Sequence, residues 1–155
     1  MLTYALAFLI GVVSGLRALT APAAVSWAVA LGWLHPESRR LALLGSRLVP
    51  IFLSLAAVAE LVSDQLPKTP SRKAPPSFVI RIVSGALCGA ALGSSGGVLT
   101  GGLIAGALGA IAGTLGGYEF RVRLVKATGG KDLPIALLED AIAIGGAFLI
   151  VSRLG

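Results

Sequence analysis

The sequence predicts an all-α, polytopic bundle of membrane helices, and three observations carry this prediction. Hydrophobic residues make up 55% of the 155-residue chain and charged residues only 13%, whereas an ordinary soluble domain is about 25% charged. The mean hydropathy is +0.90. Long apolar runs alternate with short basic or proline-rich stretches, as membrane spans alternate with interfacial loops. We therefore expect an integral membrane protein.

The charge distribution and the cysteine content argue against nucleic-acid binding and against a cysteine-based metal site. The net charge of +6 comes from 13 basic and 7 acidic residues, and the bases lie between apolar runs instead of forming a stripe with aromatic residues, so we expect no nucleic-acid partner. The single cysteine, Cys88, lies in an apolar run and forms neither an intrachain disulfide nor a metal cluster. We expect no cofactor and no metal centre. Because the usual hydrolase, nucleotide-binding and zinc motifs are missing, the enzyme class is left open but is not favoured.

The first apolar segment is too long to be one simple span. Residues 2–34 would measure about 50 Å as a straight helix, against a hydrocarbon core of about 30 Å. Gly15, Arg17, Thr20 and Pro22 interrupt its middle. Glycine and proline weaken a helix there, so we expect a broken or re-entrant segment with Gly15 and Pro22 at the break. Whether it crosses the membrane once or twice stays open at this point.

Further apolar segments follow. The expected spans are residues 48–66, 78–93, 97–117 and 133–151, with the second and third joined as a hairpin. A proline-rich basic linker over 67–77 separates a first membrane repeat, 1–66, from a second, 78–155. A second polar stretch, residues 119–132, precedes the last span.

Glycines recur every four residues in the second half, a spacing that lets membrane helices approach closely. We expect helix packing through Gly85, Gly89, Gly93, Gly109, Gly113 and Gly117.

The two halves show weak internal similarity. Residues 8–15 and 78–85 are identical at five of eight positions at an offset of 70, although Arg17 corresponds to Leu87. Three segments in each half would place the halves in inverted orientation, as in many transporters with sites near the midplane. The excess of Lys and Arg in the linker and at 121–131 favours that side as cytoplasmic, with both termini outside if all six segments cross.

Charged residues within the apolar segments are the candidate functional residues. A buried guanidinium can bind a carboxylate or phosphate in two-pronged fashion, and buried carboxylates can exchange protons or bind cations. The predicted substrate or ion pathway consists of Arg17, Thr20, Glu60, Asp64, Glu139 and Asp140. We expect Glu60 or Glu139 to pair with Arg17, since an unpaired charge is costly at membrane depth. A purely structural ion pair, or side chains at headgroup level, is the alternative.

Several stretches resemble a family of small bacterial membrane proteins catalogued as a domain of unknown function. The similar segments are GVVSGLRALTAPAAVSWA, AELVSDQLPKTPSR, GAIAGTLGG and ALLEDAIAI. The resemblance implies a location in the bacterial inner membrane. It implies no substrate, cofactor or catalytic residue.

Two functions follow as hypotheses. The first is a small membrane transporter or channel for an ion or small anionic solute, with its polar site at the broken helix. The alternative is a scaffold or assembly factor that transports nothing and uses its glycine-rich faces to pack helices within or between protomers. The expected partners are membrane lipids, a small solute or ion, and, in the second hypothesis, further copies of the chain.

Overall fold

The computed structural model describes residues 1–66 and 73–154, and this part of the chain is helical with no strand. The all-α prediction is therefore confirmed. The helices are α1 (Leu2–Leu16), α2 (Thr20–Ala30), α3 (Arg39–Ala42), the 3-10 turn η1 (Leu43–Gly45), α4 (Val49–Ser63), α5 (Pro75–Ser95), α6 (Leu99–Ala127) and α7 (Asp132–Ser152).

Three of these helices, α5, α6 and α7, are long and apolar enough to cross a membrane. The segment from α3 to α4 qualifies as a fourth only as a bent pair, with an angle of 68° at the break. The helices α1 and α2 are apolar but shorter, with 15 and 11 residues. The chain is thus an integral membrane protein, whereas six crossings and the inverted relation of the two halves stay predictions.

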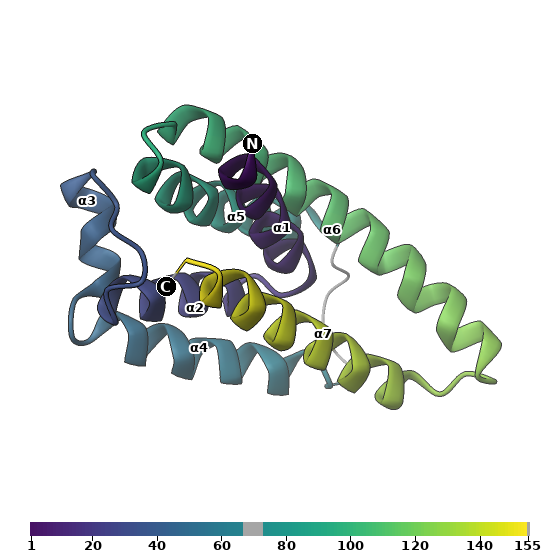
Figure 1. Cartoon of the computed structure of the whole chain (residues 1–155). Coiled ribbons are helices and arrows are strands. Elements are labelled where there is room, and N and C mark those ends of the chain that lie inside the picture. The colour runs from purple at the N-terminus through teal and green to yellow at the C-terminus, as the bar shows by residue number, and fades with distance from the viewer. Residues whose placement is uncertain (67–72, 155) are drawn as a thin grey trace.

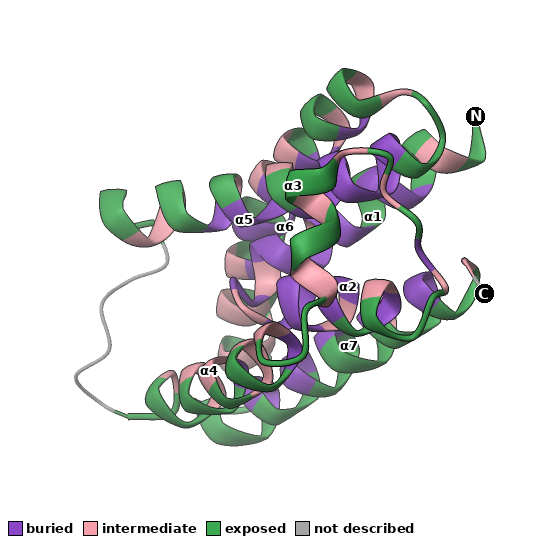
Figure 2. Cartoon of the chain, turned by 90° about the vertical axis from the view of Figure 1, so that its left-hand side faces the viewer, coloured by how far each residue is buried: buried purple, intermediate pink, exposed green. Residues whose placement is uncertain are grey.

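The helices form two packed groups, which Figure 1 shows. α1 lies against α5 and α6, and α2 lies against α4 and α7. Their contact surfaces carry small or apolar side chains, such as Ala7, Ile10, Ala21, Ala143 and Ala147. In Figure 2 the buried residues follow the interior of this bundle, while α4 shows a mostly exposed outer face.

Glycines bring α1, α5 and α6 into backbone contact. A Cβ added at Gly106 would overlap the carbonyl oxygen of Gly85, and one at Gly89 would overlap that of Gly102. On the other side of α6, a Cβ at Gly109 or Gly113 would overlap carbonyl oxygens of α1. Of the other predicted packing glycines, Gly93 lies against Gly102 and Gly117 is buried. These close approaches are possible because glycine has no side chain at the crossing.

The turn between α5 and α6 forms the expected hairpin. Gly97 has φ +69°, a conformation that glycine adopts without steric cost. The end of α6 differs from expectation, because the helix continues through the polar stretch to Ala127 and stops only before Gly129 and Gly130, whose φ angles are also positive. Leucine, arginine, lysine and alanine in that stretch are good helix formers, so the polar character marks no helix end. Of the predicted linker, residues 67–72 lie outside the described residues.

Candidate functional site

The predicted break in the first segment lies at Arg17–Leu19, between α1 and α2. Arg17 has an extended backbone, with φ −140° and ψ 115°. Gly15 precedes the break, and a Cβ there would overlap Ala110 of α6, so glycine lets the end of α1 reach that helix. Pro22 is the third residue of α2, where its missing N–H leaves no helical hydrogen bond unmade. Gly15 and Pro22 therefore flank the break, which itself falls between them.

Arg17 is completely buried and is held by two aspartates from distant helices. Its Nη1 pairs with Asp64 Oδ2 at the end of α4, and its Nη2 contacts Asp140 Oδ1 of α7. The Nε atom also donates to Asp140 Oδ1 at 2.6 Å. The choice of Glu60 or Glu139 as partner was wrong. Asp64, four residues after Glu60, and Asp140, directly after Glu139, reach Arg17 instead.

Glu60 binds the start of α2. Its Oε1 accepts the backbone N–H of Ala18 and its Oε2 that of Leu19, each at 2.8 Å. The first N–H groups of a helix have no helical partner and carry the positive end of the helix dipole. Leu19 is the N-cap of α2 and Ala18 directly precedes it, so the Glu60 carboxylate lies at the positive end of this helix. This favourable arrangement explains why Glu60, one turn before Asp64, does not pair with Arg17.

Arg81 of α5 binds the end of α1, and sequence reasoning did not single it out. Its Nη1 donates to the carbonyl oxygens of Gly15 at 2.8 Å and Leu16 at 2.7 Å. Its Nη2 lies 3.8 Å from Glu60 Oε1 and 4.0 Å from Asp64 Oδ2. Arg81 is only 3% exposed. The signal that could have found it is the one that found Arg17, a lone cation inside an apolar segment.

Hydroxyl groups complete the contacts around the break. Ser14 Oγ donates to the carbonyl oxygen of Arg81, and Ser84 Oγ to that of Ala18. Thr114 Oγ1 of α6 donates to the carbonyl oxygen of Gly15 at 3.2 Å. Ser84 and Thr114 satisfy carbonyl groups at the interruption, whereas Ser14 ties the end of α1 to α5. The irregular backbone is thus enclosed by protein, as membrane depth requires. None of these three hydroxyl residues was among the predicted pathway residues.

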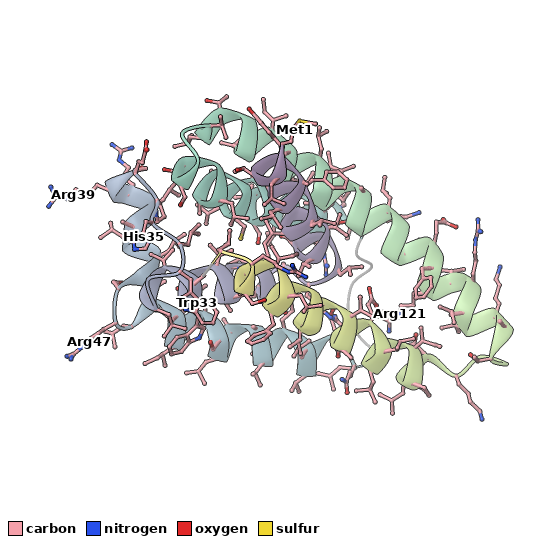
Figure 3. All side chains as sticks on the ribbon, viewed as in Figure 1. Met1, Trp33, His35, Arg39, Arg47 and Arg121 are labelled. Atoms are coloured by element: carbon pink, nitrogen blue, oxygen red, sulfur yellow. The ribbon has the colours of Figure 1, made fainter. Side chains whose placement is uncertain are left out.

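Glu139 belongs to a separate ion network at the other side of α7. Its Oε2 lies 3.7 Å from Arg121 Nη1 of α6, and Arg121 forms a two-pronged pair with Asp132 at 2.9 and 2.7 Å. Consecutive helical residues point about 100° apart, so Asp140 can face Arg17 while Glu139 faces Arg121. In Figure 3, Arg121 lies toward the end of the molecule opposite Arg39 and Arg47.

Comparison with known families agrees with this membrane architecture. The sequence model of the family described as Domain of unknown function (DUF4126) matches residues 4–152. The chain belongs to this family. No curated protein and no solved structure matches it. The resemblance drawn from the sequence motifs is confirmed, and because the family description names no activity, the argument for function rests on the site.

In this family member, five charged side chains gather at the break, and we call them the break cluster. They are Arg17, Arg81, Glu60, Asp64 and Asp140. With all five ionised, two cations face three carboxylates, a net charge of −1. The side chain of Arg17 has no exposed surface, while those of Glu60 and Asp64 are 13% and 14% exposed. The two α4 carboxylates therefore form the accessible edge of the cluster.

Thr20, the first residue of α2, also lies at this break. It is 7% exposed, and its Oγ1 has no hydrogen-bond partner within residues 1–66 and 73–154. A buried hydroxyl without a partner costs free energy of about 1–3 kcal/mol. The Thr20 hydroxyl at the break is thus a buried polar group without a hydrogen-bond partner among the described residues.

A surface hollow of about 270 Å³ lies elsewhere. It is lined by Glu37, Ser38, Ser94, Gly97 and Leu99. Ser94 follows Arg81 by 13 residues on α5, which is about 20 Å along a helix. This hollow is separate from the break cluster.

Proposed function

We propose that the protein is a small membrane transporter or channel for an ion or small anionic solute, with the α1–α2 break as its polar site. One observation carries the proposal. The two helix ends at the break each face a side chain of opposite charge, the buried Arg81 at the carbonyl end and the partly exposed Glu60 at the amide end. Many transporters bind their solutes and coupling ions at such half-helix ends.

The cost of this arrangement supports a functional role. Charged side chains inside a membrane are rare, and each costs at least about 3 kcal/mol on insertion scales. A broken helix with hydrophobic partners would avoid that cost. The break cluster supplies guanidinium and amide donors for an anion, and carboxylates for a cation or proton. Solute exchange is a use for which both kinds of group at one place are suited.

Flux measurements test the proposal. The purified chain is reconstituted into vesicles and assayed for uptake of small carboxylates, inorganic anions and monovalent cations. We expect uptake of at least one solute by the parent chain and by the control Glu119→Gln, which alters an exposed carboxylate 3.9 Å from Lys73. Asp64→Asn should lose it while remaining folded. A folded parent chain that moves no solute, or an Asp64→Asn variant with unchanged uptake, would argue against transport.

The scaffold hypothesis is favoured by a different observation. Asp64 and Asp140 pair with the two terminal nitrogens of Arg17, which is completely buried. Such a closed arrangement also suits a purely structural ion pair. Gly109 and Gly113 pack on α1 within the protomer, so their replacement tests folding and not association. Association is better tested at Phe52 of α4, which is 70% exposed. Crosslinking that Phe52→Ser abolishes, together with absent flux, would favour the scaffold.

The proposed location is the bacterial inner membrane, with lipids as the surrounding partner. The resemblance to bacterial membrane proteins supports this location. The concentration of bases at Arg121, Arg123, Lys126 and Lys131 supports a cytoplasmic position for that end. Protease or thiol-reagent access from one side of intact cells tests the orientation.

A further inference from the structure

Glu60 holds α2 in the way that a bound carboxylate solute would. Its two oxygens each take one backbone N–H, from Ala18 and Leu19, at equal distances of 2.8 Å. Arg81 Nη2 lies 3.8 Å from Oε1. Two helix-end amides beside a guanidinium are a typical anion-binding arrangement. Only the covalent link to α4 distinguishes this carboxylate from a free one.

A second observation points to a ligand at the same backbone turn. Thr20 directly follows Leu19 in the chain and is only 7% exposed. Its Oγ1 has no hydrogen-bond partner in the described residues. Arg17, on the other side of the two amides, is already ion-paired with Asp64 and Asp140, so the Thr20 hydroxyl is the group at this turn that lacks a partner among the described residues. Glu60 therefore satisfies the two amides but leaves the buried Thr20 hydroxyl beside them without a partner.

We propose that Glu60 occupies, within the chain, the binding place of a small monocarboxylate solute, and that the solute displaces it together with uptake of one proton. This inference rests on the proposed function and names its substrate class. The solute carboxylate then accepts the N–H groups of Ala18 and Leu19 that Glu60 gives up. The Thr20 hydroxyl supplies a further donor that Glu60 does not use.

Charge balance gives the reason for the proton. The groups facing Glu60 are Arg81 of α5, Asp64 of its own helix and, through Arg17, Asp140 of α7. The break cluster has a net charge of −1 when all five groups are ionised, so an added monoanion would make it −2. A proton on the released Glu60 carboxyl restores −1. No bond other than this O–H forms, and none breaks within the chain.

The place of Glu60 in the fold allows this exchange. Glu60 lies on α4, which packs on α2 and η1 and has a largely exposed outer face. Its side chain is 13% exposed, whereas Arg81 is enclosed at 4%. The proposed exchange moves Glu60 away from the two amides, while Arg81 stays bound to the carbonyl groups at the end of α1.

Formate rescue of Glu60→Ala tests the proposal. The thermal unfolding midpoint of this variant is measured with increasing sodium formate, and separately with formamide, which has a similar shape but no charge. We expect a saturable rise of several degrees with formate and none with formamide. The control Glu119→Ala removes an exposed carboxylate and should respond to formate no more than the parent chain does. Equal responses of Glu60→Ala to formate and formamide would overturn the proposal.

The parent chain provides the second measurement, should Glu60→Ala fail to fold. We expect formate to raise the unfolding midpoint of the parent chain more in mildly acidic than in mildly alkaline buffer, because the proposed binding step takes up one proton. A formate effect that is equal in both buffers would contradict the proposal. If formate raises the unfolding midpoint of Glu60→Ala but the parent chain takes up no solute in vesicles, the binding site is supported and transport is rejected. Flux without rescue would keep transport and reject the role of Glu60.

Discussion

Replacing Arg17 by methionine should strongly destabilise the protein. The change keeps most of the side-chain volume but removes the charge that Asp64 and Asp140 share. Asp64 retains Arg81 Nη2 at 4.0 Å and is 14% exposed. Asp140 is 9% exposed, and no other cation lies within 4.0 Å of it among the described residues. Leaving one carboxylate buried and unpaired costs about 3–5 kcal/mol, and we assign most of that loss to Asp140.

The single cysteine offers the assay. Cys88 is 1% exposed, so a maleimide should label it only when the bundle opens. A loss of about 3–5 kcal/mol raises the open population, and hence the labelling rate, by roughly two to nearly four orders of magnitude. The matched control Arg153→Met alters an exposed arginine at the end of α7 and should change stability by less than about 0.5 kcal/mol.

Two results would separate the explanations for this loss. Adding Asp140→Asn to Arg17→Met should recover much of the lost stability, since the amide carries no charge. If Arg17→Met labels Cys88 no faster than Arg153→Met does, the pairs around Arg17 contribute nothing to the fold and the reasoning is refuted.

Two further predictions concern the ends of the broken helix and the glycine contacts. Arg81→Met should leave the Gly15 and Leu16 carbonyl groups without their charged donor. We expect each lost hydrogen bond to lower the free energy of unfolding by about 1.5–3 kcal/mol. Faster amide exchange at residues 15–20 would show this, and unchanged exchange would contradict it. Gly106→Ala should cost about 1–3 kcal/mol because its Cβ overlaps Gly85, whereas Gly116→Ala, with nothing within 4 Å, should be neutral or slightly stabilising. Thermal unfolding compares the pair, and equal effects would argue against the close approach of α5 and α6.

Sequence alone predicted the parts of the fold that depend on length and local chemistry. A segment of residues 2–34 that is too long for one span had to break, and Gly15 and Pro22 bracketed the place. The hairpin at Gly97 followed from turn chemistry. The length of α6 could not be predicted in the same way. A helix keeps its backbone hydrogen bonds when its sequence changes from apolar to polar side chains, so the start of the polar stretch does not mark the helix end.

The contents of the candidate site were predictable, but its pairings were not. The spacing of Glu60 and Asp64 placed both on one face of α4, and both do reach the break. Which carboxylate meets Arg17 depends on the rotation and depth of α4 and α7, and these are set by packing against α2. For the same reason sequence could not choose between the adjacent Glu139 and Asp140.

Arg81 shows a different limit of sequence reasoning. The internal alignment pairs Arg81 with Gly11, a position without charge, so the repeat gives no sign of a role for Arg81. Its partners are backbone carbonyl groups of α1, which leave no mark in the side-chain sequence. A lone arginine in an apolar helix should be considered together with open backbone elsewhere in the chain.

The central claim is that the break between α1 and α2 binds a small carboxylate solute, which requires that Thr20 be reached from water in the folded protein. Thr20→Cys in a Cys88→Ser background tests it most directly, with a small, charged, water-soluble thiol reagent applied to the protein in vesicles. We predict that the new cysteine reacts in the folded protein and that formate slows the reaction, while Ala7→Cys, which replaces a buried residue in α1, stays unreactive. A Thr20→Cys thiol that reacts only after denaturation would contradict the claim and leave the break cluster as a structural contact.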